Sequence, residues 1–413
     1  MDVAVKTHKR VTGLSGNEIY CLNQLGLTAG QLCIGNSVVS IGMFGGISAG
    51  LSTLVGGEVT EITQLVHDSR MNSFDRMKEE AGQYGGVGLT GISFDLVNHG
   101  GNLEFITVGS TIHGPGERPN SMFSTSADAQ ELYCQMDAGF EPLHFVFGNV
   151  AYSIGVGGNL LGGLKTLVRG EVPQYTNIFS RTRSLALHRI KSEAKIHGAN
   201  AVIGIRTTIS ALMGAQEMLM VGTASRNPAL SAYNNDPVTS DMTNEEMWNL
   251  THLGFVPLQL VMGVSVYSLG FAGGFVSALQ SLGRGEIPGL TNILYEAREK
   301  ALARIEEDAE RCGADEVVGV KTWVYDLGGG MVEFLAIGTA VKKMPGIKTR
   351  TESLPPQAII VDEDTFVDST NNLNLNLGRK VSAAEGQAGP IGIVITVLII
   401  LFYLFVASFR ISH

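Results

Sequence analysis

The sequence predicts an α+β protein of three tandem small domains followed by one transmembrane helix. Three observations predict this fold class: a set of motifs recurs three times, each copy carries an amphipathic helix and a strand hairpin, and the C-terminal segment is apolar. The repeat period is about 114 residues, which is long for a solenoid unit and suits a small domain. Each copy is expected to be a long helix packed on a short antiparallel sheet.

The first strand of each copy aligns the repeats. Ile34–Gly42 reads I-G-N-S-V-V-S-I-G, and Phe147–Gly155 and Met262–Gly270 repeat its pattern. A glutamate preceded by glycine follows at the same distance from each segment: Glu58, Glu171 and Glu286. These matches place module 1 (divergent) at 13–115, module 2 at 126–228 and module 3 at 241–344, with polar connectors between them.

The helix of each copy is clearest in module 3. Asn292–Cys312 carries apolar residues at a spacing of four, with Thr291 as the expected N-cap and Gly313 as the expected stop. Gly198 is the corresponding stop in module 2. In module 1, Val87–Leu89 matches the start of the following strand, which predicts a turn after the helix that is three residues shorter.

The strands that follow the helix read as a hairpin. Val317–Tyr325 and Glu333–Val341 are rich in β-branched residues and are joined by a glycine-rich turn. We expect the hairpin of each module to pair with that module's first strand.

The C-terminal part predicts a membrane anchor. After a polar linker at 345–388, Ile391–Phe409 runs for 19 residues without a charge, and about 20 apolar residues span a bilayer as a helix. We therefore expect a transmembrane tail anchor at 389–409. Basic residues upstream favour a single-pass protein with its N-terminal bulk on the cytoplasmic side: Arg379 and Lys380, against Arg410 downstream.

Composition excludes several functions. The net charge of −10 and the lack of a basic stripe argue against a nucleic-acid partner. The four cysteines form no C-x-x-C pair, which argues against a zinc ribbon or a disulfide framework. No nucleophile and base recur together in the three copies, and no catalytic motif is present. The sequence therefore predicts a protein that is not an enzyme.

Module 3 carries a family resemblance. Its segments G-R-G-E, Y-E-A-R-E-K-A-L, G-A-D-E-V-V-G-V and E-F-L-A-I-G-T-A-V resemble the bacterial YbjQ-type domain, a family with a heavy-metal-binding label. Module 2 matches well at Gly198–Ile205, and module 1 matches less. The resemblance implies a compact α+β domain that forms homopentamers, without a known metal ligand set. It predicts a membrane-anchored, homo-oligomeric ring or shell. The alternative is a tethered protein that binds a heavy metal or a small molecule.

Candidate metal ligands follow from slots shared between copies. Cys21 and Cys134 share one slot, and His197 and Cys312 share another. A buried cysteine more simply acts as a small hydrophobic residue. The three repeated carboxylates (Glu58, Glu171 and Glu286) could cap a helix, pair with an arginine two residues earlier (Arg169 or Arg284), or form a ring that collects cations. A divalent metal is the cofactor that the second hypothesis implies.

The glycine-rich segment Ser268–Glu286 resembles a phosphate-binding loop only superficially, because no Walker lysine recurs. Its apolar residues at i, i+4 and i+7 instead predict a short helix whose small residues permit close approach by a neighbouring module. The candidate oligomer contacts in this segment and its two counterparts are Ile47, Leu51, Leu160, Leu164, Ala272, Gly274, Phe275 and Leu279.

Overall fold

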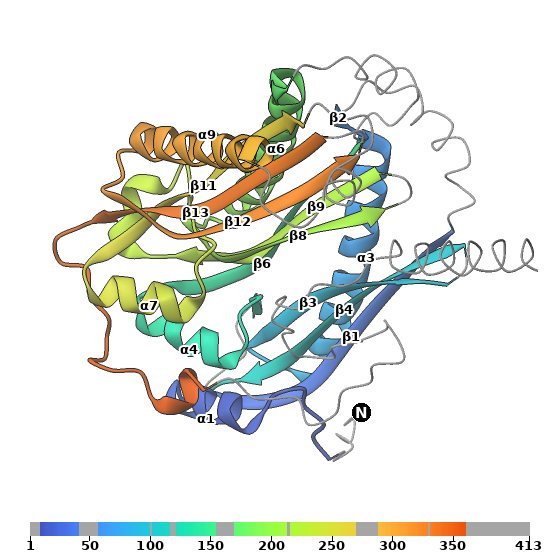
Figure 1. Ribbon diagram of the computed structural model, residues 1–413. Coiled ribbons are helices and arrows are strands. Elements are labelled where there is room, and N and C mark those ends of the chain that lie inside the picture. Colours follow the sequence, from blue (N-terminus) through green and yellow to red (C-terminus); the bar gives the residue numbers. More distant parts are fainter. Residues whose placement is uncertain are drawn as a thin grey trace, which may run out of the picture. The chain divides into compact units, whose positions relative to one another are not determined.

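The computed structural model describes residues 9–40, 57–99, 101–115, 121–153, 169–212, 215–269, 288–328 and 331–360 (Figure 1). The predicted anchor and all eight candidate oligomer contacts of the glycine-rich segments lie outside these ranges. Within these ranges, no helix combines the length and apolar character needed to cross a membrane. The tail anchor and its orientation therefore stay predictions.

The modules share one order of main elements: a short helix, a long strand, a long helix and a strand hairpin. Module 1 contains α1 (Gly16–Gln24), β1 (Thr28–Ser40), β2 (Gly57–Glu58), α3 (Thr60–Tyr84), β3 (Gly88–Asn98) and β4 (Asn102–His113). Module 2 contains β5 (Phe123–Ser124), α4 (Ala129–Asp137), β6 (Glu141–Ser153), β7 (Gly170–Glu171), α6 (Pro173–Ile196), β8 (Ala201–Leu212) and β9 (Ala215–Arg226), followed by the 3-10 helix η2 (Pro228–Tyr233). Module 3 contains β10 (Val238–Thr239), α7 (Asn244–His252), β11 (Phe255–Ser268), α9 (Pro288–Cys312), β12 (Glu316–Gly328) and β13 (Met331–Lys343).

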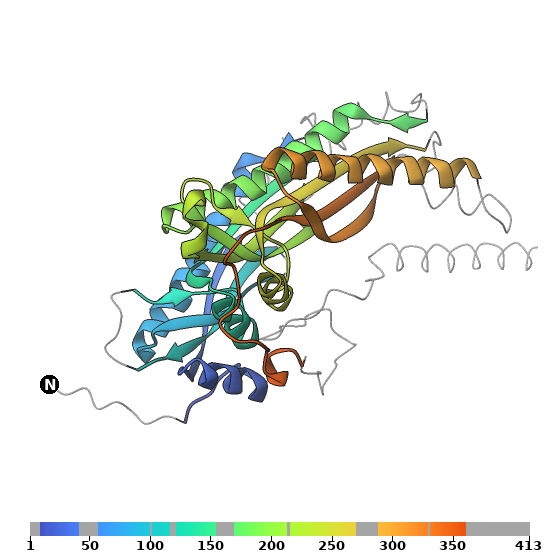
Figure 2. The same ribbon diagram turned by 90° about the vertical axis from the view of Figure 1, so that its left-hand side faces the viewer.

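The predicted helix-on-sheet arrangement is confirmed. The hairpins β3–β4, β8–β9 and β12–β13 are antiparallel, and the second strand of each pairs with the first long strand of its own module. The long helices α3, α6 and α9 pack on these strands, as Figures 1 and 2 show. Most of these strands run for 11 to 13 residues, so the sheets are longer than the sequence suggested.

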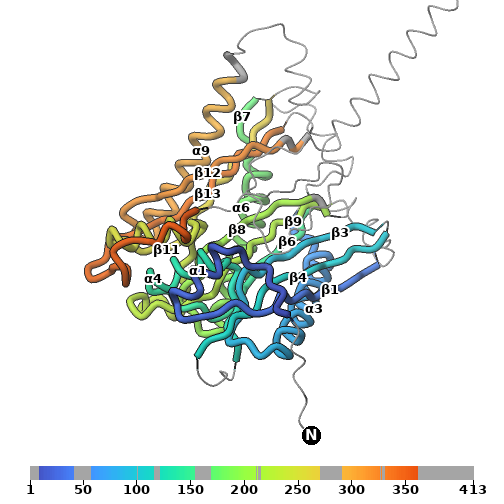
Figure 3. Tube along the Cα trace, turned by 90° about the horizontal axis from the view of Figure 1, so that it is seen from below, coloured from blue at the N-terminus to red at the C-terminus, as the bar shows by residue number. Residues whose placement is uncertain are grey.

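The modules exchange short strands with their neighbours. Strand β2 of module 1 pairs with the end of β6 in module 2. In the same way, β7 of module 2, labelled in Figure 3, pairs with the end of β11 in module 3. In the opposite direction, β5 lies parallel to β3 and β10 lies parallel to β8. Two of the glycine–glutamate pairs found in the sequence, Gly57–Glu58 and Gly170–Glu171, are therefore strands that a module adds to the sheet of the next. The third pair, Gly285–Glu286, lies outside the described residues.

The boundaries of α9 differ from the prediction. The helix begins at Pro288, four residues before the predicted start, so Thr291 lies inside the first turns and is not the N-cap. Proline suits the first turn because the N–H groups of that turn have no hydrogen-bond partner within the helix, so a residue without an N–H loses no bond there. Gly313 follows the helix with φ 70°, as its assignment as the stop requires.

The predicted shorter turn in module 1 is wrong. Gly85 ends α3 with φ 74°, and Gly91 (φ 65°) sits at a bulge in β3. The glycines Gly204 and Gly319 occupy the same bulge in β8 and β12. The three modules therefore align without a gap here. The segment of module 1 that corresponds to those around Gly204 and Gly319 is Thr90–Gly91–Ile92 and not Val87–Leu89.

A glycine in each first strand permits close packing of the long helix. A Cβ placed on Gly148 would lie 2.3 Å from the Ala186 carbonyl oxygen of α6. The same contact would be 1.9 Å at Gly35 and 1.8 Å at Gly263. A carbonyl on a helix backbone cannot retreat alone, so any side chain at these positions forces the whole helix away from the sheet.

We predict that Gly148→Ala lowers the free energy of unfolding by about 1–3 kcal/mol, because overpacking of a dense core costs that much. Thermal unfolding followed by circular dichroism measures the change. Gly82→Ala is the control, since a Cβ there meets nothing within 4 Å and alanine favours a helix over glycine. An unfolding midpoint for Gly148→Ala as high as that of the control would contradict the packing argument.

Candidate functional site: the junctions between modules

The junction between modules 2 and 3 contains a buried ion pair. Arg183 extends from α6 and its Nε donates to Oε1 of Glu333 on β13 at 2.9 Å, with a second bond from Nη2. Both side chains are 1% exposed. Burial works against the charge on Arg183, but the carboxylate beside it raises the pKa of Arg183 above its usual range. The pair joins residues 150 positions apart in the chain.

The junction between modules 1 and 2 repeats this pair. Arg70 of α3 makes a bidentate contact with Glu217 of β9. Its Nη1 donates to Oε1, and its Nη2 donates to Oε2 at 2.8 Å. Asn149 of β6 adds a hydrogen bond from Nδ2 to Oε1 of the same carboxylate at 3.2 Å. A forked guanidinium contact fixes orientation as well as distance. Each pair thus sets how the helix of one module docks on the sheet of the next.

A second ion pair lies at the exchanged strands. Glu58 of β2 contacts Arg189 of α6 at 2.7 Å. Glu171 of β7 contacts Arg304 at 2.6 Å and Lys300 at 3.1 Å, both on α9. Partial burial would raise the pKa of Glu171, but hydrogen bonds from these two cations outweigh it and lower that pKa.

The expected pairing of Glu171 with Arg169 is therefore wrong, because the described cations that contact Glu171 lie on the helix of the next module. Glu58, which has a glycine two residues earlier, also pairs with the helix of the next module. The side chain of Arg169 instead reaches the Leu269 carbonyl at the end of β11, 3.5 Å from Nε. Glu286 and Arg284 lie outside the described residues.

Apolar contacts surround the ion pairs. At the first junction, α3 and the residue before it contribute Val59, Ile62 and Val66 to a core shared with module 2 through Ala151, Leu212 and Ala215. At the second, the corresponding residues are Val172, Tyr175 and Phe179, in a core shared with module 3 through Val266, Leu327 and Met331. The hydroxyl of Thr63 accepts a hydrogen bond from Ala151 N at 2.9 Å, and Thr176 accepts one from Val266 N at 3.0 Å.

The cysteine candidates for metal binding are part of the core. Cys21 on α1 and Cys134 on α4 are both fully buried and belong to the same apolar cluster. Burial raises the pKa of both thiols, with nearby carboxylates adding to the effect. Because a metal binds the thiolate, these surroundings favour the packing role over the ligand role.

The other two candidates, His197 and Cys312, make different contacts, although Cys312 is partly buried against the apolar cluster that holds Cys21 and Cys134. His197 stacks on His144 with ring centroids 3.8 Å apart. Burial, helped by His197, lowers the pKa of His144 to about 4, so that ring is neutral near pH 7. Cys312 donates from its thiol to the Ala309 carbonyl at 3.2 Å. Among the described residues, no three His, Cys, Asp or Glu side chains gather as a metal site would require.

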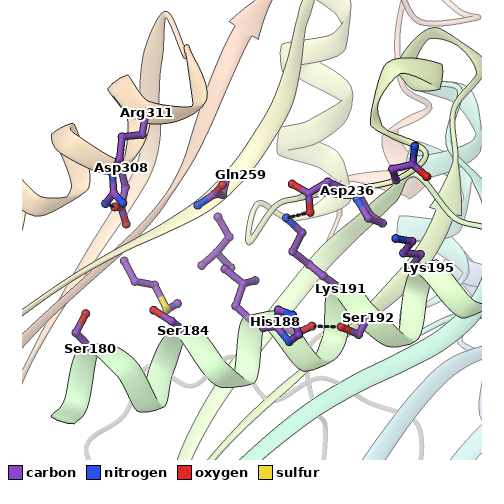
Figure 4. Close-up of a pocket in the computed structure, with 15 residues that line it drawn as sticks. Ser180, Ser184, His188, Lys191, Ser192, Lys195, Asp236, Gln259, Asp308 and Arg311 are labelled. Carbon is purple, nitrogen blue, oxygen red and sulfur yellow. Dashed lines mark hydrogen bonds and ion pairs between the residues drawn. The ribbon is translucent and has the colours of Figure 1, made fainter. Parts of the chain in front are cut away.

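A polar groove of about 530 Å³ runs along the outer face of the second junction (Figure 4). Its lining comes from α6, α9, β11 and the loop before β10. Lys191 of α6 pairs with Asp236 of that loop at 2.6 Å, and Arg311 pairs with Asp308 within α9. These two pairs neutralise part of the charge in the groove, which Lys195 also lines, and the groove contains none of the candidate metal ligands.

The buried arginines were not identified from the sequence. Each lies on a helix, and its partner is more than 140 residues away. A signal was nevertheless present in the repeats. An arginine recurs at one helix position and a glutamate at one strand position in all three modules: Arg70, Arg183 and Arg298, and Glu104, Glu217 and Glu333.

Comparison with known proteins identifies relatives of all three modules. A family model described as "Putative heavy-metal-binding" matches residues 26–112, 139–227 and 256–344, well over half of the chain. An encapsulin nanocompartment protein of Mycobacterium tuberculosis is 32% identical over 241 residues, which cover 56% of this chain and 90% of that protein. UPF0145 proteins of Archaeoglobus fulgidus (46% over 87 residues, 21% of this chain, 81% of the relative) and Thermus thermophilus (45% over 85, 20% and 75%) are similar to one module.

We predict that Arg183→Met lowers the free energy of unfolding by about 3–5 kcal/mol, because it leaves the Glu333 carboxylate buried without a partner. Chemical denaturation of the full chain measures the change. The double variant Arg183→Met, Glu333→Leu removes both charges and is expected to recover most of the loss. Equal instability of the single and double variants would show that packing volume, and not the unpaired charge, is responsible.

Proposed function

The chain belongs to the YbjQ-type family that matches it three times, and we propose that it is a self-assembling shell or ring protein without enzymatic activity. Its modules act as pseudo-equivalent subunits joined in one chain. The function lies in the contacts that modules make with one another, and the junctions are its functional site.

The single observation that carries this proposal is the similarity to a nanocompartment protein. That relative is called an encapsulin nanocompartment protein, and the matched segment covers 90% of its length. Because nearly the whole relative is matched, the property its name describes resides in the region that the two chains share. We therefore transfer shell formation to this chain.

The junctions support an assembly role. Arg183 and Glu333 are placed out of water, and desolvating two charges is costly unless their geometry is well satisfied. The same solution appears at the other junction with Arg70 and Glu217. Two copies of one interface in a chain indicate that this module surface is built for repeated contact with another module.

We further place the assembly at a membrane. The support is the sequence alone: Ile391–Phe409 has the length and composition of a transmembrane helix. Its tether would hold many copies of the assembly at one surface, with the modules on the cytoplasmic side.

The full chain, extracted in mild detergent, is expected to run as a large homo-oligomer and not as a single chain. Mass photometry gives the mass distribution, and class averages from electron microscopy give the symmetry. Particles with rotational symmetry or a closed shell are the expected result. A homogeneous population with the mass of one chain would refute shell or ring formation.

The tether has a separate test. Leu398→Arg together with Leu401→Arg should move the chain from the carbonate-resistant membrane fraction to the supernatant, because an arginine near the centre of a transmembrane helix costs about 2.5–3.5 kcal/mol. Leu398→Ile with Leu401→Ile is the matched control and should stay in the membrane. Wild-type protein in the supernatant would reject the anchor while leaving the assembly proposal in place.

A further inference from the structure

The two internal junctions leave one half-junction over at each end of the described modules. Each junction joins the long helix of one module to the sheet of the next. Among the described modules, no other module packs its sheet on helix α9 of module 3, and no other module packs its long helix on the sheet of module 1. These two surfaces correspond, residue by residue, to the two sides of the internal junctions.

The helix side carries Arg298, the counterpart of Arg70 and Arg183. Its side chain is 48% exposed, whereas those of Arg70 and Arg183 are 5% and 1% exposed. Its only described acidic neighbour is Glu299, the next residue along the helix, at 3.9 Å. Thr291 is also exposed, although its counterparts Thr63 and Thr176 are buried.

The sheet side carries Glu104 on β4, the counterpart of Glu217 and Glu333. Glu104 accepts hydrogen bonds from Asn36 at 2.9 Å and from His99 at 2.7 Å, and these lower its pKa, so it is ionised. Asn36 holds this carboxylate just as Asn149 holds Glu217. The acceptor half of the junction is thus already assembled.

The strand beside it is open as well. Val38 of β1 is 57% exposed, whereas its counterparts Ala151 and Val266 are fully buried under the preceding module. Within the described sheets β1 is an edge strand, whereas β2 pairs alongside β6 and β7 pairs alongside β11. Arg76 donates to the Asn36 carbonyl as Arg189 does to Asn149, yet no described carboxylate lies against Arg76.

The reciprocal contact of the junction is also incomplete. Strands β3 and β8 each receive a two-residue parallel strand from the next module, through Gly88–Leu89 and Ala201–Val202. The corresponding segment of β12, Glu316–Val317, pairs only with β13 among the described strands. The segment of module 1 at the register of β5 and β10 is Arg10–Val11. Val11 is 66% exposed, and Arg10 would lie opposite Glu316, which has the opposite charge.

We propose that α9 of one copy docks on the β1–β4 face of a second copy of this chain, with Arg298 paired to Glu104 as Arg70 is to Glu217. The same contact places Arg10–Val11 of the second copy along β12 of the first. The partner is another copy because both halves of the missing junction belong to this chain. This head-to-tail contact rests on the proposed self-assembly and specifies how it propagates.

A charge swap on the full chain tests this pairing. Arg298→Glu places two carboxylates together at the contact, and Glu104→Arg places two guanidinium groups there. Each single variant is expected to lose the large species and to run at the mass of one chain in mass photometry. The double variant Arg298→Glu, Glu104→Arg restores one opposite-charge pair per contact, so it is expected to recover assembly.

Two controls separate the pairing from general effects. Arg311→Glu makes the same change of charge at the C-terminal end of α9, where the side chain is 69% exposed. Its counterpart in module 2, Ile196, stays 81% exposed although another module follows, so this position lies outside the contact and the variant should assemble like the wild type. Thermal unfolding of every variant checks that the chain is folded. Arg298 is half exposed, so its replacement should leave the unfolding midpoint of the dissociated chain unchanged.

The outcomes distinguish the inference from the proposed function. Assembly of the wild type and of both single variants alike would overturn the head-to-tail contact and leave shell formation standing. Dissociation of the singles without recovery in the double variant would overturn the Arg298–Glu104 pairing. A wild type that runs as one chain would overturn shell formation, and the head-to-tail contact with it.

Discussion

The buried pairing of an arginine on one module with a glutamate on the next is the constraint on which the arrangement of the modules depends. Arg183 and Glu333 are both withdrawn from water, and neither could be left there alone without a large loss of stability. The helix must therefore meet the neighbouring sheet at one position and one angle. Apolar contacts around the pair supply buried area, but area alone does not fix the position of the helix along the sheet. The two hydrogen bonds from Nε and Nη2 of Arg183 to Oε1 of Glu333 restrict that position.

This constraint changes what a module is. By sequence, a module is a unit bounded by loops, and it would be expected to fold alone. In the structure, β2 completes the sheet of module 2, β7 completes that of module 3, and β5 and β10 reach back to the preceding sheets. The sheet of each module therefore includes a strand from a neighbouring module. Removing one would expose strand edges and a buried charge in the next, so the stability of the chain is shared across the junctions.

Local features of the fold could be predicted from the sequence because each is encoded within a few residues. The helix of module 3 follows from its apolar spacing, and the stop at Gly313 follows from a conformation that glycine adopts readily. The misplaced strand of module 1 shows the limit of local matching. Val87–Leu89 resembles its counterparts in letters, but the positive φ of Gly91 defines the equivalent position.

The junctions could not be predicted in the same way because their information is divided between modules. Nothing near Glu171 in the sequence indicates Arg304, since the fold alone brings them together. The repeats did contain the answer in a different form. A polar residue that recurs on the helix face toward a neighbouring module, as Arg70 and Arg183 do, is expected to have a partner that recurs as well. Glu217 and Glu333 are those recurrent partners.

The fusion of three modules in one chain limits the symmetry of any closed assembly. If every module occupies an equivalent position and whole chains close the ring, the number of positions is a multiple of three. A ring of five equivalent modules, which the family resemblance implies for single-domain members, cannot be filled by complete three-module chains. A heterologous contact closes into a ring only when its rotation divides a full turn, and otherwise it continues as a helix or a curved wall. Fusing three modules therefore fixes two contacts of every three permanently. The third contact, which we propose between Arg298 and Glu104, is the one that joins separate chains.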